Sequence, residues 1–160
     1  MAIIYESENF NVQSADQPLV DRFDGGHITI DPKVPVSTRQ QLSPRLAIEL
    51  MRLISVTGQA METVMKKNGV NIGRINYQDN GNWSVFKPGG AQLHYHLYGR
   101  STEAVFQPYG ETLLFPYKKD DHPEWYRHLR PLTELDVKEI KEEIIRLLAS
   151  AAYSDEAWKY

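Results

Sequence analysis

The sequence contains no cysteine, which excludes disulfide bonds, thiolate nucleophiles and thiolate-bound zinc. It also has no apolar run near the roughly 18 residues that a transmembrane helix needs. Its first residues, MAIIYESENF, lack the basic segment and apolar stretch of a secretory signal. Positive charge is not in excess either, since the formal net charge is −3, whereas proteins that bind duplex nucleic acid are usually basic. We therefore expect a soluble cytoplasmic protein with no membrane partner and no bulk nucleic-acid binding.

The size and composition are those of an ordinary globular protein. The 160 residues are 41% hydrophobic and 24% charged, both near the globular average. A chain of this length buries about two-thirds of its unfolded surface. There is no internal repeat and no low-complexity linker. We therefore expect one domain over residues 1–160.

Two helices are predicted from apolar spacing and capping signals. The first begins where Ser43 can cap and Pro44 fits the first helical position, and it ends before Asn68-Gly69. The second follows Pro131, with Thr133 as its cap and apolar residues at helical spacing beyond it. Both apolar stripes indicate core packing.

Strand-like segments precede and separate these helices. A loop over 79–90, DNGNWSVFKPGG, is rich in turn-forming residues. The order of segments shows no alternation of strand, helix and parallel strand, so it favours an α+β fold with a mainly antiparallel sheet of about five strands. The expected strands are 2–6, 10–13, 26–31, 69–78 and 91–99, with a weaker candidate at 112–117.

The segment QLHYHLYGR (92–100) places two histidines on one face of a predicted strand. Because side chains alternate along a strand, Gln92, His94, His96 and Tyr98 share a face, and the apolar side chains between them face the core. A polar row of this kind is costly to bury without partners. It must be hydrated, mutually hydrogen-bonded or functional.

Two glycines precede this strand. The backbone of Gly89 and Gly90 can approach a ligand closely or present N–H groups to an anion. The pair is therefore a candidate for substrate binding.

Three interpretations of the histidines remain open from the residues alone. They are chance residues on an exposed strand face, or a metal pair as in cupin barrels, or catalytic imidazoles. A cupin needs a glutamate about four residues after the pair, but the next carboxylate is Glu103, seven residues after His96; the spare ligands are His27, His122 and His128. The catalytic interpretation uses one neutral imidazole as nucleophile toward phosphorus and the other to deliver a proton.

Taken together, the motifs resemble the histidine-triad (HIT) family of nucleotidyl hydrolases and transferases. The resemblance implies a HIT-like fold, a homodimer formed through the long helix, no metal and no cofactor. It also implies hydrolysis or transfer at the α-phosphate of a nucleotide conjugate, such as a dinucleoside polyphosphate or nucleoside phosphoramidate. It covers residues 3–100 and leaves 101–160 as a variable region. The matching segments are IIYESENF (3–10), GGHITIDPK (25–33), the helix 44–67, NIGRINYQDNG (71–81) and QLHYHLYGR (92–100).

The triad is incomplete, because only two of its three histidines are present. Aligning the trailing Gly99-Arg100 without a gap puts Gln92 first, His94 at the nucleophile and His96 third. Aligning from the preceding glycines instead makes His96 the nucleophile and puts Tyr98 third. We prefer the first register, in which His94 attacks the α-phosphate and His96 contacts the phosphate or assists the leaving group. Loss of one histidine also suggests an alternative, a HIT-like protein that only binds nucleotides or a protein partner.

The resemblance implies roles for residues around the triad. Asp21 is the nearest match to the residue that holds the ribose, and Asn76 and Gln78 fall where family members have polar residues that orient phosphate. His27 and Arg100 are expected to support the site rather than to react.

Overall fold

The structure is a computed structural model that describes residues 2–79, 84–86, 88–116 and 121–160. Five strands form one open sheet in the order β1-β2-β3-β5-β4, and every neighbouring pair is antiparallel. The predicted α+β class and strand number are confirmed, and the open sheet makes the cupin-barrel alternative wrong. The strands are β1 (Ala2–Glu6), β2 (Phe10–Ser14), β3 (His27–Pro32), β4 (Ile72–Asp79) and β5 (Tyr95–Ser101).

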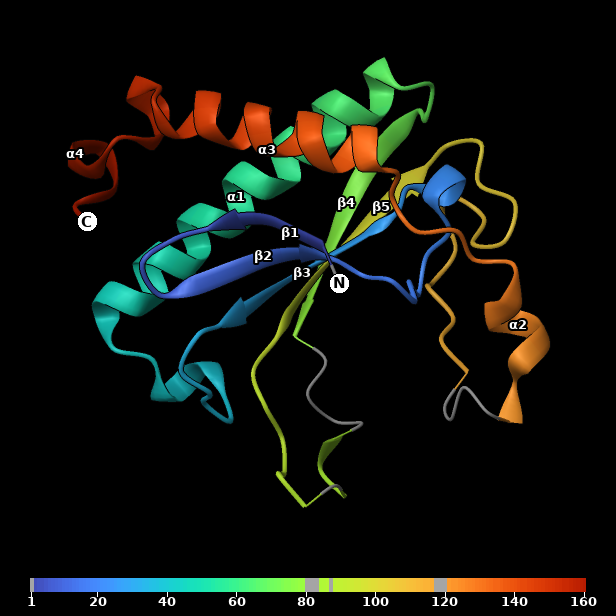
Figure 1. Ribbon diagram of the computed structural model, residues 1–160, viewed down its shortest axis with the longest axis horizontal. Coiled ribbons are helices and arrows are strands. Elements are labelled where there is room, and N and C mark those ends of the chain that lie inside the picture. Colours follow the sequence, from blue (N-terminus) through green and yellow to red (C-terminus); the bar gives the residue numbers. More distant parts are fainter. Residues whose placement is uncertain (1, 80–83, 87, 117–120) are drawn as a thin grey trace.

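Two long helices cover one face of this sheet (Figure 1). Helix α1 (Pro44–Lys67) begins at Ser43, whose hydroxyl accepts a hydrogen bond from the N–H of Leu46 at 3.3 Å. Helix α3 (Glu134–Leu148) begins with a capping box between Thr133 and Asp136. Both predicted caps are confirmed. The short elements are the α-helices α2 (Pro123–Arg127) and α4 (Asp155–Trp158) and the 3₁₀ helices η1 (Arg22–Asp24), η2 (Arg39–Gln41) and η5 (Ala151–Tyr153).

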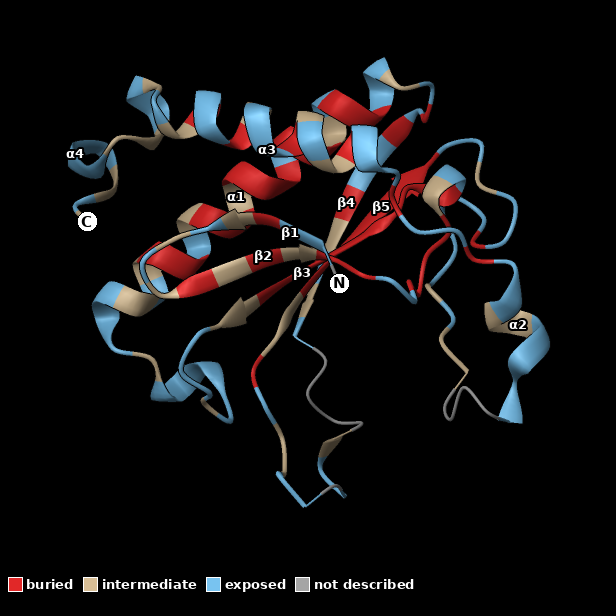
Figure 2. Ribbon diagram, viewed as in Figure 1, coloured by how far each residue is buried: buried red, intermediate tan, exposed pale blue. Residues whose placement is uncertain are grey.

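The main hydrophobic core lies between the sheet and these two helices (Figure 2). Helix α1 contacts β4, β5 and α3, while α3 contacts β1. The strands contribute alternating apolar residues, for example Ile28 and Ile30 of β3 and Leu97 of β5, all with 0% exposure. Because side chains alternate, the residues between them form a second, polar face on the side away from the helices.

The C-terminal region belongs to this same core. Ile140, Ile144 and Leu147 of α3 are buried in it. The start of α3 is fixed by Asp136, whose carboxylate accepts two hydrogen bonds from Arg22, at 2.6 and 2.8 Å. The segment that the resemblance left as variable therefore supplies one of the two helices that cover the sheet.

Two strand predictions need correction. The strand expected from residue 91 begins only at Tyr95, because the N–H of Leu93 donates to the carbonyl of Val36 at 2.7 Å instead of joining the sheet ladder. The weaker candidate at 112–117 forms no strand over 112–116, and Tyr117 lies outside the described residues. In the predicted loop 79–90, residues 80–83 and 87 also lie outside them. None of the described helices is long and apolar enough to cross a membrane.

Candidate functional site

A row of aromatic rings runs along the polar face of β5. The ring of His94 meets that of His96 edge-on at 4.7 Å between centroids, and the ring of His96 stacks on that of Tyr98 at 5.3 Å. Leu93 and Leu97 point the other way and are buried in the core. The predicted alternation is therefore confirmed from Leu93 to Tyr98, whereas Gln92 precedes the strand and is exposed. We call His94, His96 and Tyr98 the His row.

Hydrogen bonds through His27 of β3 determine which ring nitrogen of His96 carries the proton. The backbone N–H of Leu19 can only donate, and it donates to Nδ1 of His27 at 3.2 Å. Neutral His27 therefore carries its proton on Nε2, which lies 2.8 Å from Nδ1 of His96. His96 must accept that hydrogen bond, so its own proton lies on Nε2. His27 thus orients the ring of His96.

His96 is held neutral. Burial, and secondly the electrostatic repulsion that two protonated rings at His94 and His96 would experience, lowers the pKa of His96 from 6.5 to about 3. At neutral pH its Nε2–H is an uncharged hydrogen-bond donor. Such a donor can stabilise a negatively charged oxygen without itself changing charge.

His94 has the opposite proton arrangement. Its Nδ1 lies 2.8 Å from the backbone carbonyl oxygen of Gln92, and a carbonyl can only accept. Nδ1 therefore carries the proton, and the lone pair of neutral His94 lies on Nε2. The side chain of Gln92 is exposed, so the contact that orients His94 comes from the backbone and not from the amide.

The neighbouring strands extend this polar face. In the sheet register His96 stands between Thr29 of β3 and Gln78 of β4, and Asn76 is paired with Tyr98. Directly paired residues point to the same face. The two polar residues predicted on β4 are therefore brought beside the His row.

Three residues on this face, Gln13, Thr29 and Asp31, were not predicted as site residues. Thr29 donates from its hydroxyl to Asp31 at 2.9 Å, and Gln13 donates to the same Asp31 oxygen at 3.0 Å. The signal was present in the alternation of HITID (27–31), which puts His27, Thr29 and Asp31 on one face. Together they continue the polar surface from the His row across β3 to β2.

Asp21 is placed differently from the prediction. Its side chain has 0% exposure, and its carboxylate accepts hydrogen bonds from Arg130 at 2.8 and 2.9 Å and from the N–H of Phe23 at 2.9 Å. Burial alone would raise the pKa of Asp21, but the hydrogen bonds from Arg130 hold it below its ordinary value. The carboxylate therefore anchors the segment before α3, and it has no exposed oxygen for a ribose.

The other predicted residues flank the His row. Gly90 has a φ of 65°, which favours glycine, and Gly89 is exposed and adjacent to the Gln92 side chain. Arg100 is 5% exposed and donates to the carbonyl oxygens of Pro108 at 2.8 Å and Glu111 at 2.9 Å. It fixes the segment that follows β5.

A close backbone approach explains the glycine before Arg100. A Cβ atom on Gly99 would overlap the backbone of Gly25, and a Cβ atom on Gly25 would overlap that of Gly99. The N–H of Gly99 donates to the carbonyl of Gly26 at 3.1 Å. This contact holds β5 against the start of β3, where His27 meets His96.

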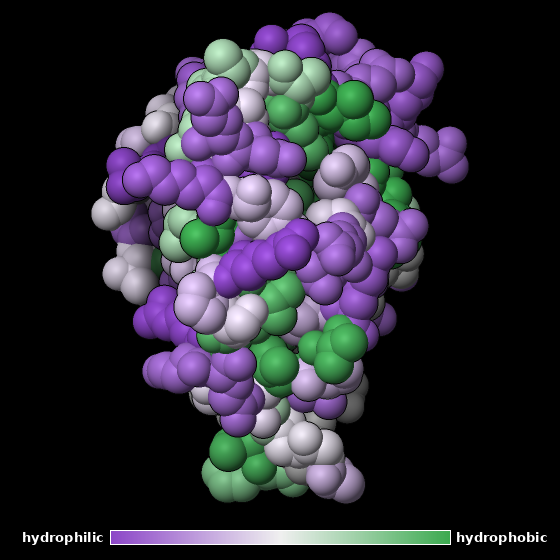
Figure 3. Space-filling model, turned by 90° about the vertical axis from the view of Figure 1, so that its left-hand side faces the viewer, coloured by the Kyte–Doolittle hydropathy of each residue, from purple (hydrophilic) through white to green (hydrophobic). Residues whose placement is uncertain are grey.

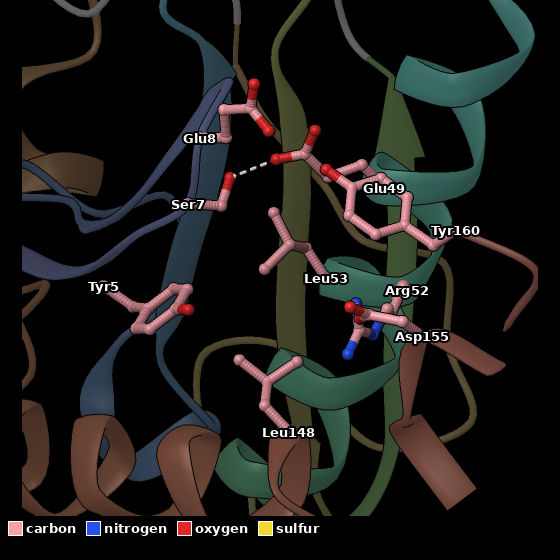
Figure 4. Close-up of a pocket in the computed structure, with 9 residues that line it drawn as sticks. All are labelled: Tyr5, Ser7, Glu8, Glu49, Arg52, Leu53, Leu148, Asp155 and Tyr160. Carbon is pink, nitrogen blue, oxygen red and sulfur yellow. Dashed lines mark hydrogen bonds and ion pairs between the residues drawn. The ribbon is translucent and has the colours of Figure 1, made fainter. Parts of the chain in front are cut away.

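A separate cavity of about 290 Å³ lies among β1, α1, the end of α3 and α4, away from the His row (Figure 4). Here Ser7 donates to Glu49 at 2.6 Å, and Arg52 pairs with Asp155 at 2.8 Å. Burial would raise the pKa of Glu49, but its hydrogen bonds from Ser7 and Asn9 hold it below its ordinary value. These contacts tie the N-terminal and C-terminal segments to α1. The face of the molecule on this side is mostly hydrophilic, with hydrophobic groups in separate small patches (Figure 3).

Among the described residues no three His, Asp or Glu side chains are grouped so that they could hold a metal ion. The two nitrogens that face each other in the His27–His96 pair are engaged in a mutual hydrogen bond.

The fold is similar to that of solved histidine triad proteins. No protein-family model and no curated protein matches the sequence. A hypothetical histidine triad nucleotide-binding protein from Sulfolobus tokodaii superposes with a TM-score of 0.57 at 19% identity, over 91% of this chain and 85% of the other. A histidine triad protein from Marinobacter aquaeolei gives 0.55 at 16% identity, over 89% and 90%. A zinc-bound histidine triad family protein from Mycobacterium smegmatis gives 0.53 at 19% identity, over 92% and 87%.

The chain therefore has a HIT-like fold, as the resemblance in its motifs predicted. At these identities the likeness concerns the fold. What the site can do depends on its own side chains.

Proposed function

We propose that this protein binds nucleotides and acts at the α-phosphate of a nucleotide conjugate, with His94 as the nucleophile. The observation that carries the proposal is the contact between His94 Nδ1 and the Gln92 carbonyl, because it leaves the lone pair on Nε2. A neutral imidazole nitrogen with a free lone pair is a good nucleophile at neutral pH. This supports the register in which His94, and not His96, attacks.

The reaction that follows is a two-step displacement. Nε2 of His94 forms a bond to the α-phosphorus, and the bond between phosphorus and the leaving group breaks, with its electron pair going to the leaving group. The resulting imidazolium is positively charged, and the Gln92 carbonyl stabilises it through the Nδ1–H hydrogen bond. Water or another acceptor then attacks phosphorus, the bond to His94 breaks, and the acceptor proton is released.

His96 serves this chemistry as a neutral donor. Its Nε2–H, fixed by His27, can hydrogen-bond to a phosphoryl oxygen or to the leaving atom as negative charge develops there. Gln78, directly opposite His96 in the sheet, and Asn76 beyond it can orient the phosphate. Gly89 and Gly90 provide accessible backbone before the row.

Activity assays with site variants test the proposal. The native protein, His94→Ala and His96→Ala are incubated with adenosine phosphoramidate and with diadenosine polyphosphates. We expect the native protein to release AMP and His94→Ala to lose at least about 10³-fold in rate, because the nucleophile is gone. In His96→Ala we expect slow turnover with a nucleotidyl adduct on His94, detected by mass spectrometry of the digested protein.

A second candidate function is nucleotide binding without turnover. Two observations favour it: His96 is only 6% exposed, and a glutamine stands at the first triad position. Tight nucleotide binding by the native protein with neither product nor adduct would overturn the enzymatic proposal and leave this one.

Dimer formation through α1 is also part of the proposal. Met51 of α1 and Tyr77 of β4 are large hydrophobic residues with 51% and 44% exposure. They border a hollow of about 470 Å³ between α1 and the edge of the sheet, at Gly58 and Tyr95. An exposed apolar surface beside an edge strand supports contact with a second copy.

A further inference from the structure

Another cavity lies on the polar face of the sheet, beyond Tyr98 at the end of the His row. Its volume is about 260 Å³. Strand register places its residues on β4 and β5, on the same face as the histidines. The segment after β5 forms the opposite wall. The lining residues are Arg74, Asn76, Arg100, Tyr109, Gly110 and Glu111.

Two arginines are directly paired at the base of this cavity. Arg74 of β4 stands opposite Arg100 of β5 in the sheet register. Like charges directly opposite each other on a sheet are destabilising unless something offsets the repulsion. Within the described part of the chain neither arginine has a carboxylate partner at ion-pair distance. Arg100 is instead held by backbone carbonyls, which leave its formal charge uncompensated.

Arg100 also carries an unpaired polar atom. The residue is 5% exposed, and its Nε is buried without a hydrogen-bond partner among the described residues. Such groups are rare in native proteins because a buried donor without an acceptor costs free energy. A missing acceptor at Arg100 and an excess of positive charge point to the same kind of ligand, an anion.

We propose that this cavity is an anion site for a phosphoryl or diphosphate group, separate from the His row. The guanidinium fork matches the oxygens of phosphate, and Arg74, which is exposed, can close on an anion held above Arg100. Asn76, two residues from Arg74 on the same face, adds an amide donor. Arg100 lies four residues beyond His96, or about 13 Å along the strand, so an anion here does not reach the reactive nitrogen of His94.

The anion has two possible sources with the same chemistry. It is either free, as pyrophosphate, or the distal phosphate of a nucleotide whose other end lies at the His row. Tyr98, between the two places, has 0% exposure and its ring packs at 4.9 Å from that of Phe115. Because these packed rings lie between the His row and the cavity, one nucleotide is not expected to span both places, which favours a free anion.

Pyrophosphate titration by calorimetry tests the site directly. We expect Arg74→Gln to weaken binding about tenfold, since it removes one charged donor from the anion. The matched control is Arg39→Gln, an exposed arginine of η2 that does not line the cavity. Glu111→Gln should act in the opposite direction and tighten binding about threefold, because Glu111 is the acidic residue of the lining. Equal affinities for the native protein and Arg74→Gln, or no binding to either, would overturn the proposal.

A parallel titration with ATP separates the two sources. If the anion is free, Arg74→Gln weakens pyrophosphate binding and leaves ATP binding unchanged. If it is the distal phosphate of a nucleotide, Arg74→Gln weakens ATP binding as well, and AMP binding is unaffected. His94→Ala is expected to keep its pyrophosphate affinity. If the native protein shows no turnover but still binds pyrophosphate, the proposed reaction is contradicted and the anion site is not.

Discussion

The imidazole of His94 is oriented by the backbone of Gln92, whose carbonyl oxygen lies 2.8 Å from Nδ1. Any residue at position 92 offers the same carbonyl, so the glutamine at the first triad position does not remove the contact that places the lone pair on Nε2. The orientation of the nucleophile therefore does not depend on which side chain stands at the first triad position.

Substitution of Gln92 by alanine tests this point. We expect Gln92→Ala to retain nucleotidyl adduct formation within about threefold of the native rate, because the variant keeps the backbone carbonyl and loses only an exposed side chain. Single-turnover kinetics with adenosine phosphoramidate measure it. The contrast is His94→Ala, which should form no adduct. A loss in Gln92→Ala as large as that in His94→Ala would show that the amide itself takes part.

The proposed dimer can be tested at Met51. Because Met51 is half exposed on α1 beside the hollow at Gly58, we expect Met51→Glu to place a charge in the interface and to convert the dimer to a monomer. Sedimentation velocity at micromolar concentration measures the change. Val34→Glu, at a hydrophobic residue with 76% exposure outside this hollow, should remain dimeric. A monomeric native protein would contradict the prediction.

Local signals in the sequence predicted the helices and the His row correctly. Capping by Ser43 and Thr133 depends on residues within one helical turn, and the alternation from Gln92 to Tyr98 depends on neighbours two apart. Both are short-range geometry, which a sequence states directly. The strand start at Tyr95 was missed because a contact with Val36, distant in sequence, takes the N–H of Leu93.

Long-range pairings decided what the sequence left open. Asp21 was expected at a ribose, but Arg130, 109 residues away in the chain, occupies its carboxylate. The tautomer of His96 depends on His27, 69 residues away. No local pattern encodes which arginine meets which carboxylate, or which imidazole nitrogen accepts. These contacts come from the tertiary packing of the C-terminal segment and of β3 against β5.

Asp136 joins three parts of the chain, and its removal should be costly. Its buried carboxylate accepts hydrogen bonds from Arg22, from Thr133 at the start of α3, and from Asn68 at the end of α1. Burial alone would raise its pKa, but these hydrogen bonds hold it at about 2. We expect Asp136→Asn to lower the free energy of unfolding by about 3 kcal/mol, because Arg22 loses its charged partner. Urea unfolding measures it. Glu143→Gln, which breaks a surface pair with Arg146, should change stability by under about 1 kcal/mol, and equal losses in the two variants would contradict the assignment.

The neutral state of His96 makes a prediction about acid stability. Its pKa is about 3 in the folded protein and 6.5 as the reference for the unfolded chain, so between these values the unfolded state binds more protons. Stability therefore rises with pH across this window: the contribution of His96 is complete above pH 6.5 and is lost progressively as the pH falls toward 3. The expected slope from this one group approaches 1.4 kcal/mol per pH unit.

Urea unfolding at pH 4, 5, 6 and 7 isolates this contribution when the native protein is compared with His96→Gln. The variant has its own overall stability, but its dependence on pH should be shallower by about that slope, since the titrating group is gone. His122→Gln, at an exposed histidine, should keep the native dependence. Parallel curves for the native protein and His96→Gln would mean that His96 titrates alike in both states. Burial beside His94 would then not hold it neutral, and its role as an uncharged donor in the proposed reaction would fail.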